Sequence, residues 1–80
     1  MINKTTISIF PNPASEKISI DYTEMQRVKM KVYNTIGECV LQSDLIGGTN
    51  MINISSLTSG IYMIRLTSVD GAYQQKLMKN

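Results

Sequence analysis

The fold class of this chain is decided by residues 62–79, which read Tyr62-Met63-Ile64-Arg65-Leu66-Thr67-Ser68-Val69-Asp70-Gly71-Ala72-Tyr73-Gln74-Gln75-Lys76-Leu77-Met78-Lys79. Apolar residues alternate with polar ones at the start of this stretch, a period of two that is typical of a strand. Asp70-Gly71 then forms the strongest short hairpin signal in the chain, because a type I′ turn requires two positive φ angles. The stretch therefore predicts two antiparallel strands joined by a tight turn.

The same period of two extends outward from this hairpin to the start of the chain. Further strands are expected around residues 7–9, 18–22, 28–33, 39–45 and 52–54, separated by turns at 34–37, 47–50 and 55–60. Only residues 23–27 could hold a helical turn. Seven short strands at this spacing predict an all-β fold, a seven-stranded antiparallel immunoglobulin-like β-sandwich.

Composition limits the kinds of function that this chain can have. The 80 residues contain no His and one Cys, Cys39, which excludes the usual zinc sets, a Ser-His-Asp triad and an internal disulfide. The carboxylates are dispersed along the chain and form no acid–base pair. We therefore expect no enzyme, no catalytic or metal-binding residues and no cofactor.

Charge and hydropathy exclude two further classes of partner. The net charge is +2, and the basic residues are scattered without a run, so nucleic-acid binding is not expected. No apolar stretch approaches the ~18 residues of a membrane span, and no signal-peptide pattern follows Met1. Residues 1–80 are expected to be a single domain, with residues 1–6 an added start or the remnant of a linker. An exported protein would have to carry it as one piece of a longer chain.

Two motifs have a structural interpretation. Leu57-Thr58-Ser59-Gly60-Ile61-Tyr62 is typical of a tyrosine corner, in which Leu57 closes one end of the fold, Gly60 turns the chain and the Tyr62 hydroxyl bonds upstream backbone. Phe10-Pro11-Asn12-Pro13 predicts a sharp corner after the first strand, because proline fixes φ and lacks an N–H donor. Asn34 and Gly37 suit a hairpin loop with an Asx-turn.

In this order, the motifs resemble the type A C-terminal sorting domain of the type IX secretion system. The resemblance runs from Ile7 to Asn80 and rests on four blocks: Phe10-Pro11-Asn12-Pro13, Val32-Tyr33-Asn34 with Gly37, the segment Ile52 to Tyr62, and Lys76-Leu77-Met78-Lys79. Met78 departs from the family pattern, which usually has a β-branched residue there.

The resemblance implies a C-terminal secretion signal. Such a domain is covalently part of a larger cargo protein that enters the periplasm and then reaches the cell surface or the medium through the outer-membrane translocon. In many cases a sortase-like protease removes the domain. The family motif residues are expected to be mainly structural: Pro11, Asn12, Pro13, Gly37, Leu57, Gly60 and Tyr62.

The surface that a translocon could recognise is expected on the last hairpin. A turn at Asp70-Gly71 pairs Ile64 with Leu77 and Arg65 with Lys76, and the latter pair would be mildly repulsive unless a bulge changes the register or an acidic group lies nearby. The outward face then carries Ile61, Met63 and Met78, flanked by basic residues. Two interpretations stay open: this row is an adaptable protein contact, or the N-terminal segment covers it. The residues proposed for translocon recognition are Lys76, Leu77, Met78, Lys79, Met63 and Arg65.

The C-terminal tail also has two interpretations. As the final strand it could leave an unpaired edge for a receptor strand, and in isolation such an edge could allow a strand-exchanged dimer. Alternatively, Lys76 and Lys79 are charges that protect the edge from aggregation. The first interpretation predicts that removing residues 76–80 blocks surface delivery while the fold survives.

An alternative function is a fibronectin-like accessory module that binds glycan or a surface protein. Glycan platforms usually present exposed aromatic rings. This chain has no Trp, one Phe and four Tyr, and Tyr62 is expected to be buried.

Overall fold

The computed structural model describes residues 7–22, 27–69 and 71–80. Within them lie seven strands, as predicted: β1 (Ile7–Phe10), β2 (Lys17–Tyr22), β3 (Val28–Tyr33), β4 (Cys39–Leu45), β5 (Gly48–Asn53), β6 (Gly60–Ser68) and β7 (Gly71–Lys79). The expected linker remnant at 1–6, most of the helical turn expected at 23–27, and residue 70 of the expected hairpin turn lie outside the described residues.

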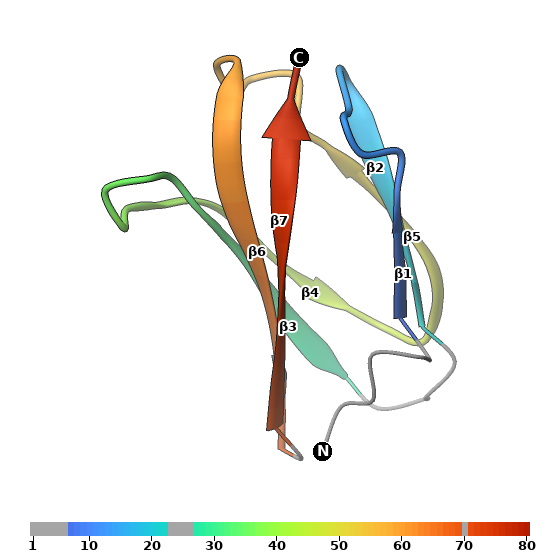
Figure 1. Ribbon diagram of the computed structural model, residues 1–80. Coiled ribbons are helices and arrows are strands. Elements are labelled where there is room, and N and C mark those ends of the chain that lie inside the picture. Colours follow the sequence, from blue (N-terminus) through green and yellow to red (C-terminus); the bar gives the residue numbers. More distant parts are fainter. Residues whose placement is uncertain (1–6, 23–26, 70) are drawn as a thin grey trace.

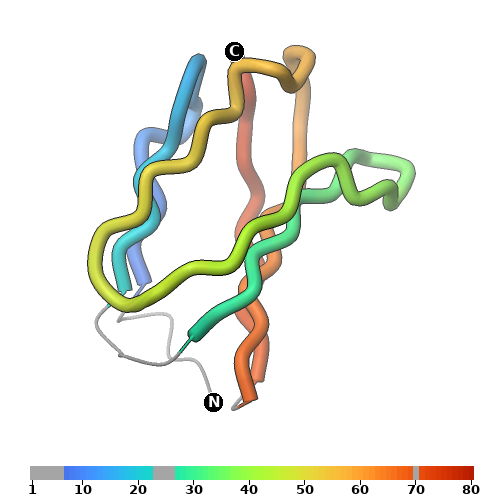
Figure 2. Tube along the Cα trace, turned by 180° about the vertical axis from the view of Figure 1, so that it is seen from behind, coloured from blue at the N-terminus to red at the C-terminus, as the bar shows by residue number. Residues whose placement is uncertain are grey.

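The strands form two antiparallel sheets, which Figures 1 and 2 show as separate layers. One sheet has the order β1-β2-β5 and the other the order β4-β3-β6-β7. The connections β2–β3, β4–β5 and β5–β6 therefore pass from one sheet to the other. The described part of the chain is all-β.

Both sheets contribute to one hydrophobic core. Alternation along the strands produces it: Ile18, Ile20 and Tyr22 of β2 are buried, as are alternate residues of β3 and β6. Burial of these apolar side chains is the main stabilising contribution to such a fold. The buried core comprises Ile9, Ala14, Ile18, Ile20, Tyr22, Val28, Met30, Val32, Leu45, Ile54, Leu57, Tyr62, Ile64, Leu66 and Leu77.

The register of the last hairpin differs from the prediction. Ser68 pairs with Gly71, and Leu77 faces Tyr62 rather than Ile64. Every β7 residue keeps its predicted face, because the partner shifts by two residues and the side-chain period is also two. The observed register places Arg65 opposite Gln74, and so avoids the repulsion expected between Arg65 and Lys76.

The fifth strand is also displaced from its expected position. It begins at Gly48, whose φ of 105° suits glycine, and it ends at Asn53. Ile54 lies just beyond the strand, but it is fully buried and its N–H donates to the Glu16 carbonyl at 2.8 Å. Pairing with β2 carries the strand back to Gly48, which lies opposite Tyr22.

The Asn34 loop forms as predicted. The Asn34 side-chain oxygen accepts hydrogen bonds from the Ile36 and Glu38 N–H groups at 3.1 and 2.9 Å, which makes the expected Asx-turn. The N–H of Gly37 donates to the Asn34 carbonyl at 3.1 Å, and Gly37 has a φ of 88°. Because this φ lies in the left-handed region, glycine is the residue best suited to the position.

The tyrosine corner is confirmed at the entrance to β6. The buried Tyr62 hydroxyl donates to the Thr58 carbonyl at 2.7 Å, and Leu57 is buried beside the core. The ring fills the core while the hydroxyl satisfies a backbone acceptor of the connection. This contact fixes the path of the chain from one sheet to the other.

Candidate functional site

The segment after β1 is hydrogen-bonded to the end of β7. The Asn12 side-chain amide donates to the Lys76 carbonyl at 2.9 Å, and its oxygen accepts the Met78 N–H at 3.0 Å. One side-chain amide thus supplies the donor and the acceptor that a neighbouring strand would supply. Pro11 and Pro13, both preceded by cis peptide bonds, flank this asparagine.

Backbone pairing continues from Asn12 to the C-terminal residue. The N–H of Ala14 donates to the Met78 carbonyl at 2.9 Å, and the N–H of Asn80 donates to the Ala14 carbonyl at 2.8 Å. The Asn80 side chain reaches Ser15 Oγ at 3.2 Å. We call residues 12–15 the strap, because they hold the end of β7 along its outer edge. Figure 1 shows the turn between β1 and β2 beside the end of β7.

The strap changes the expected picture of an unpaired tail. Along β7 the outward backbone groups belong to alternate residues, and those of Met78 and Asn80 are occupied by the strap. Closer to the start of β7, Ala72 and Gln74 point the same way and have no hydrogen-bond partner on that side among the described residues. The edge is therefore open in the first half of β7 and occupied in the second.

The predicted apolar row lies on the exposed face of β6 and β7. Ile61 is 48% exposed, Met63 38% and Met78 45%, so the strap does not cover them. Ile61 pairs with Met78, and Met63 pairs with the exposed Lys76. We call these four residues the hairpin patch. Large apolar side chains that stay exposed in a row suit contact with another protein.

A shallow hollow joins the hairpin patch to the Asn34 loop. Ile61, Met63 and Lys76 line it from the hairpin, and Asn34 and Thr35 line it from the loop between β3 and β4. The two loop residues were not among the predicted recognition residues. Their position depends on the pairing of β3 with β6, in which Tyr33 faces Met63.

Leu77 does not belong to the exposed surface, although it was grouped with the recognition residues. Its side chain is fully buried in the core, whereas Lys79 is half-buried and donates to the Asn80 carbonyl at 3.1 Å. Removing residues 76–80 would therefore delete a core residue together with the strap contacts. The expectation that such a truncated domain keeps its fold is not supported by this packing.

A second group of side chains gathers on the outer face of β3, β4 and β6. Lys29 and Lys31 alternate with the buried residues of β3, and Lys31 lies directly opposite Arg65. Together with Arg27, these residues line one hollow, which also contains Tyr33, Asp44, Thr67, Ser68 and Val69. We call this the basic face. The sequence interpretation treated the charges as scattered; the alternation in β3 placed two lysines on one face, but only strand pairing brings Arg65 beside them.

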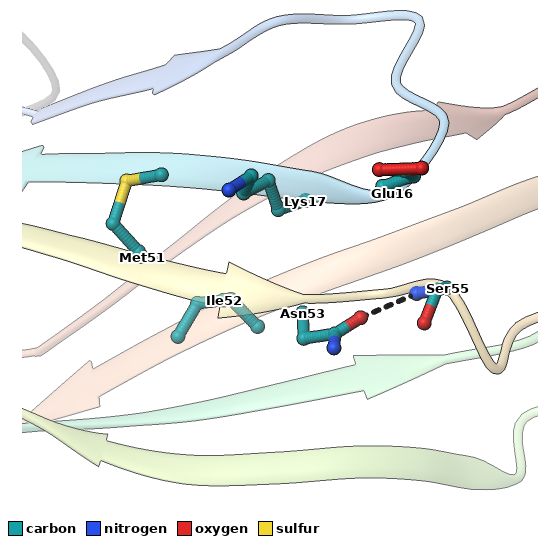
Figure 3. A pocket seen from close by; sticks show the side chains of 6 residues that line it. All are labelled: Glu16, Lys17, Met51, Ile52, Asn53 and Ser55. Carbon is teal, nitrogen blue, oxygen red and sulfur yellow. Dashed lines mark hydrogen bonds between the residues drawn. The ribbon is translucent and has the colours of Figure 1, made fainter.

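Another hollow lies on the other sheet, along the paired strands β2 and β5 (Figure 3). Glu16, Lys17, Met51, Ile52, Asn53 and Ser55 line it. The Asn53 side-chain oxygen accepts the Ser55 N–H at 2.8 Å, so part of its polar lining is already engaged. No aromatic ring lines this hollow.

The aromatic side chains do not form a shared platform. Tyr22 and Tyr62 are buried, and Tyr73 packs against the core. Phe10, 47% exposed, lies on β1, whereas Tyr33 lies on the other sheet. Because stacking of sugars requires neighbouring exposed rings, these positions do not favour a glycan site.

Among the described residues, no group of three or more His, Cys, Asp or Glu side chains could hold a metal ion. The same part of the chain contains no helix long and apolar enough to cross a membrane.

Burial raises the pKa of the Tyr22 hydroxyl above its ordinary value of 10.0. Tyr22 belongs to the core, and this shift therefore reflects packing.

Comparison with known proteins identifies one family over nearly the whole chain. The model of the family described as "Secretion system C-terminal sorting domain" matches residues 8–80. The chain is similar to an endo-acting ulvan lyase of Formosa agariphila, with 31% identity over 74 residues, and to β-agarase D of Zobellia galactanivorans, with 32% identity over 73 residues. Each alignment covers 90% of this chain and 14% of the relative.

Proposed function

This chain belongs to the family of secretion system C-terminal sorting domains, as its resemblance to type IX sorting domains indicated, and we propose that the hairpin patch is where the translocon recognises it. The domain is a sorting signal rather than a catalyst, and it directs export of the protein that carries it. Because the chain spans only 14% of its relatives, we propose that it travels as the tail of a larger cargo protein. Removal by a sortase-like protease at the cell surface is part of the same proposal.

The proposal rests on one combined observation: the strap holds the C-terminal end of the chain in place, and apolar side chains are exposed beside that end. Five hydrogen bonds join residues 12–15 to residues 76–80, so the tail presents a defined shape. Beside it, Met63 and Met78 are exposed on neighbouring strands. A preformed surface binds at a lower entropic cost than a tail that must first become ordered.

We also propose that the fold is an immunoglobulin-like sandwich formed by one domain. The sheet orders β1-β2-β5 and β4-β3-β6-β7, with a tyrosine corner at the entrance to the sixth strand, support this assignment. The open first half of the β7 edge supports the further proposal that the isolated domain forms a strand-exchanged dimer.

The test compares surface variants, because truncation would remove Leu77 from the core. A reporter protein fused to the domain is expressed in a bacterium with a type IX system, either with Met63→Ser and Met78→Ser together or with Met51→Ser as the control. Met51 is 58% exposed and lies on the other sheet. The double variant is expected to accumulate in the periplasm, whereas the control is delivered.

Circular dichroism of the isolated variant domains confirms that they are folded, since exposed substitutions usually change stability by less than about 0.5 kcal/mol. Delivery of the folded double variant at the level of the unsubstituted domain would exclude the hairpin patch as the recognition surface. The family assignment would be unaffected by that outcome.

A further inference from the structure

Among the residues that the structure describes, the basic face carries more positive than negative charge. Five of the chain's eight Lys and Arg residues lie on the outer side of the sheet formed by β4, β3, β6 and β7, namely Arg27, Lys29, Lys31, Arg65 and Lys76. Among the described residues that line the hollow of the first four, only Asp44 has a carboxylate. Positive potential is therefore concentrated on one face of a chain whose net charge is only +2.

The central pair of this face is repulsive. Lys31 and Arg65 lie directly opposite each other on neighbouring strands, and both are half-buried. Like charges at opposed positions of a sheet destabilise it, and partial burial reduces the screening of their charges by water. An ordinary solvated face would be expected to place a neutral or acidic residue at one of these positions.

Asp44 does not relieve this pair. It pairs with Lys29 in the strand register, at 3.9 Å between Lys29 Nζ and Asp44 Oδ1, and both side chains are about 60% exposed (59% and 61%). Such an exposed contact contributes little. The remaining neighbour of Lys31 on β4 is Gln42, which is uncharged. Among the described residues, no carboxylate therefore neutralises this pair, and an acidic partner would supply the missing negative charge.

We propose that the basic face binds an acidic, extended segment of a protein partner, centred on Lys31 and Arg65. Lys29 and Lys31 are two residues apart on one strand, a separation of about 6.8 Å. An extended peptide repeats the side chains of one face at the same interval, so carboxylates at every second residue match this spacing. Among the described residues, Tyr33 is the one aromatic residue that lines this face, so bases would find no row of rings on which to stack, which disfavours single-stranded nucleic acid.

This site is distinct from the hairpin patch. Arg65 was grouped with the tail residues on sequence grounds, but it faces Gln74 on β7 and Lys31 on β3 and lines the hollow of the basic face. Lys76 lines the other hollow, with Ile61 and Met63. The proposal does not depend on how the translocon recognises the domain.

The test titrates the complete chain with three synthetic hexapeptides at low ionic strength and follows backbone amide shifts by NMR. The peptides are Glu-Thr-Glu-Thr-Glu-Thr, the block isomer Glu-Glu-Glu-Thr-Thr-Thr and the neutral Gln-Thr-Gln-Thr-Gln-Thr. The alternating acidic peptide is expected to bind most tightly and to shift the amides of Lys29, Lys31 and Arg65. Removing one charge by Arg65→Gln or Lys31→Gln is expected to weaken binding about two- to five-fold, the scale of one exposed ion pair.

Lys17→Gln is the matched control, because it removes the same charge from an exposed position on the other sheet. It is expected to change the affinity for the alternating peptide by much less than Arg65→Gln does. Equal weakening by the two variants would mean that only net charge matters and would overturn the proposal, as would shifts confined to other parts of the domain or no binding at all.

Two further titrations distinguish the binding of an acidic peptide from the binding of other anions. Phosphatidylglycerol vesicles and inorganic phosphate are titrated against the same variants. Tighter binding of either one, with the same dependence on Arg65, would assign the face to phosphate groups and overturn the assignment to a protein partner. Equal affinity for the alternating and block peptides would overturn the proposal that the peptide binds in an extended form with carboxylates at every second residue.

Denaturant unfolding of Arg65→Gln is expected to show unchanged or slightly increased stability, because the substitution relieves the repulsion between Arg65 and Lys31.

Discussion

Replacing Asn12 by alanine tests whether the strap holds the end of β7. The substitution removes two hydrogen bonds, one to the Lys76 carbonyl and one from the Met78 N–H, at 2.9 and 3.0 Å. A hydrogen bond of this kind contributes about 0.5–1.5 kcal/mol net, and the exposure of these two favours the lower part of that range. We expect Asn12→Ala to lower the free energy of unfolding by about 1–2 kcal/mol.

Two measurements follow from this magnitude. Each kcal/mol lowers the melting temperature of a domain of this size by about 4–8 °C, which is measurable by thermal unfolding. In hydrogen exchange, the Met78 amide is expected to exchange roughly 5–30-fold faster, because local opening there becomes easier by the same free energy. Asn53→Ala is the control: it removes one side-chain contact, to the Ser55 N–H, far from the tail in sequence. It is expected to leave Met78 exchange unchanged.

Asn12→Asp distinguishes the contributions of the two hydrogen bonds. A carboxylate still accepts the Met78 N–H but offers no donor to the Lys76 carbonyl, so Met78 protection should be largely retained while stability falls. Unchanged Met78 exchange in Asn12→Ala would refute the reasoning, since it would mean that the backbone contacts of Ala14 hold the tail without the asparagine.

Three further predictions concern the core. Tyr62→Phe removes the hydroxyl that donates to the Thr58 carbonyl, and it is expected to lower the free energy of unfolding, measured with denaturant, by about 1 kcal/mol. Tyr33→Phe is the control, because the Tyr33 ring lies on the outer face, and it should lower the free energy of unfolding by much less. Leu77→Ala is expected to cost about 2–5 kcal/mol, a large part of the roughly 5–15 kcal/mol of a typical domain; a loss below 1 kcal/mol would contradict its burial. For Tyr22, burial raises the folded-state pKa above 10.0, so the unfolded chain loses its proton first and the free energy of unfolding falls as the pH rises beyond that value. Tyr22→Phe should reduce this fall above about pH 10.

The strap gives the tail a definite state before any partner binds. A receptor strand could add to the open first half of β7 directly, whereas pairing along the second half would require residues 12–15 to leave. Variants of Asn12 therefore change the availability of that edge without altering a side chain of the hairpin patch. This makes them useful for distinguishing recognition of the edge from recognition of the face.

Much of the fold could be predicted from local pattern. Alternation identified seven strands, and alternate residues such as Ile18, Ile20, Val32 and Ile64 are buried, because the two faces of a strand meet different environments. The Asn34 loop and the Tyr62 corner could also be predicted, because each depends on residues within four positions of one another. The family motifs could be recognised in the sequence for the same reason, because each consists of residues close together in the chain.

The candidate site was less accessible to such reasoning. The hairpin patch was anticipated from alternation, but the register of β6 and β7 was not, because two registers that differ by two residues place the same side chains on the same faces. Sequence order offered no sign that Asn12 would meet Lys76, since the two are 64 positions apart.

Local alternation and turn chemistry thus determined the strands and their faces, since those properties are settled by neighbours along the chain, and the resemblance of four short motifs indicated the family. Only tertiary structure decided that the strap occupies half of the final edge and that Lys31 lies opposite Arg65. Each of these is a contact between distant segments, and its partner is selected by the packing of two sheets around one core.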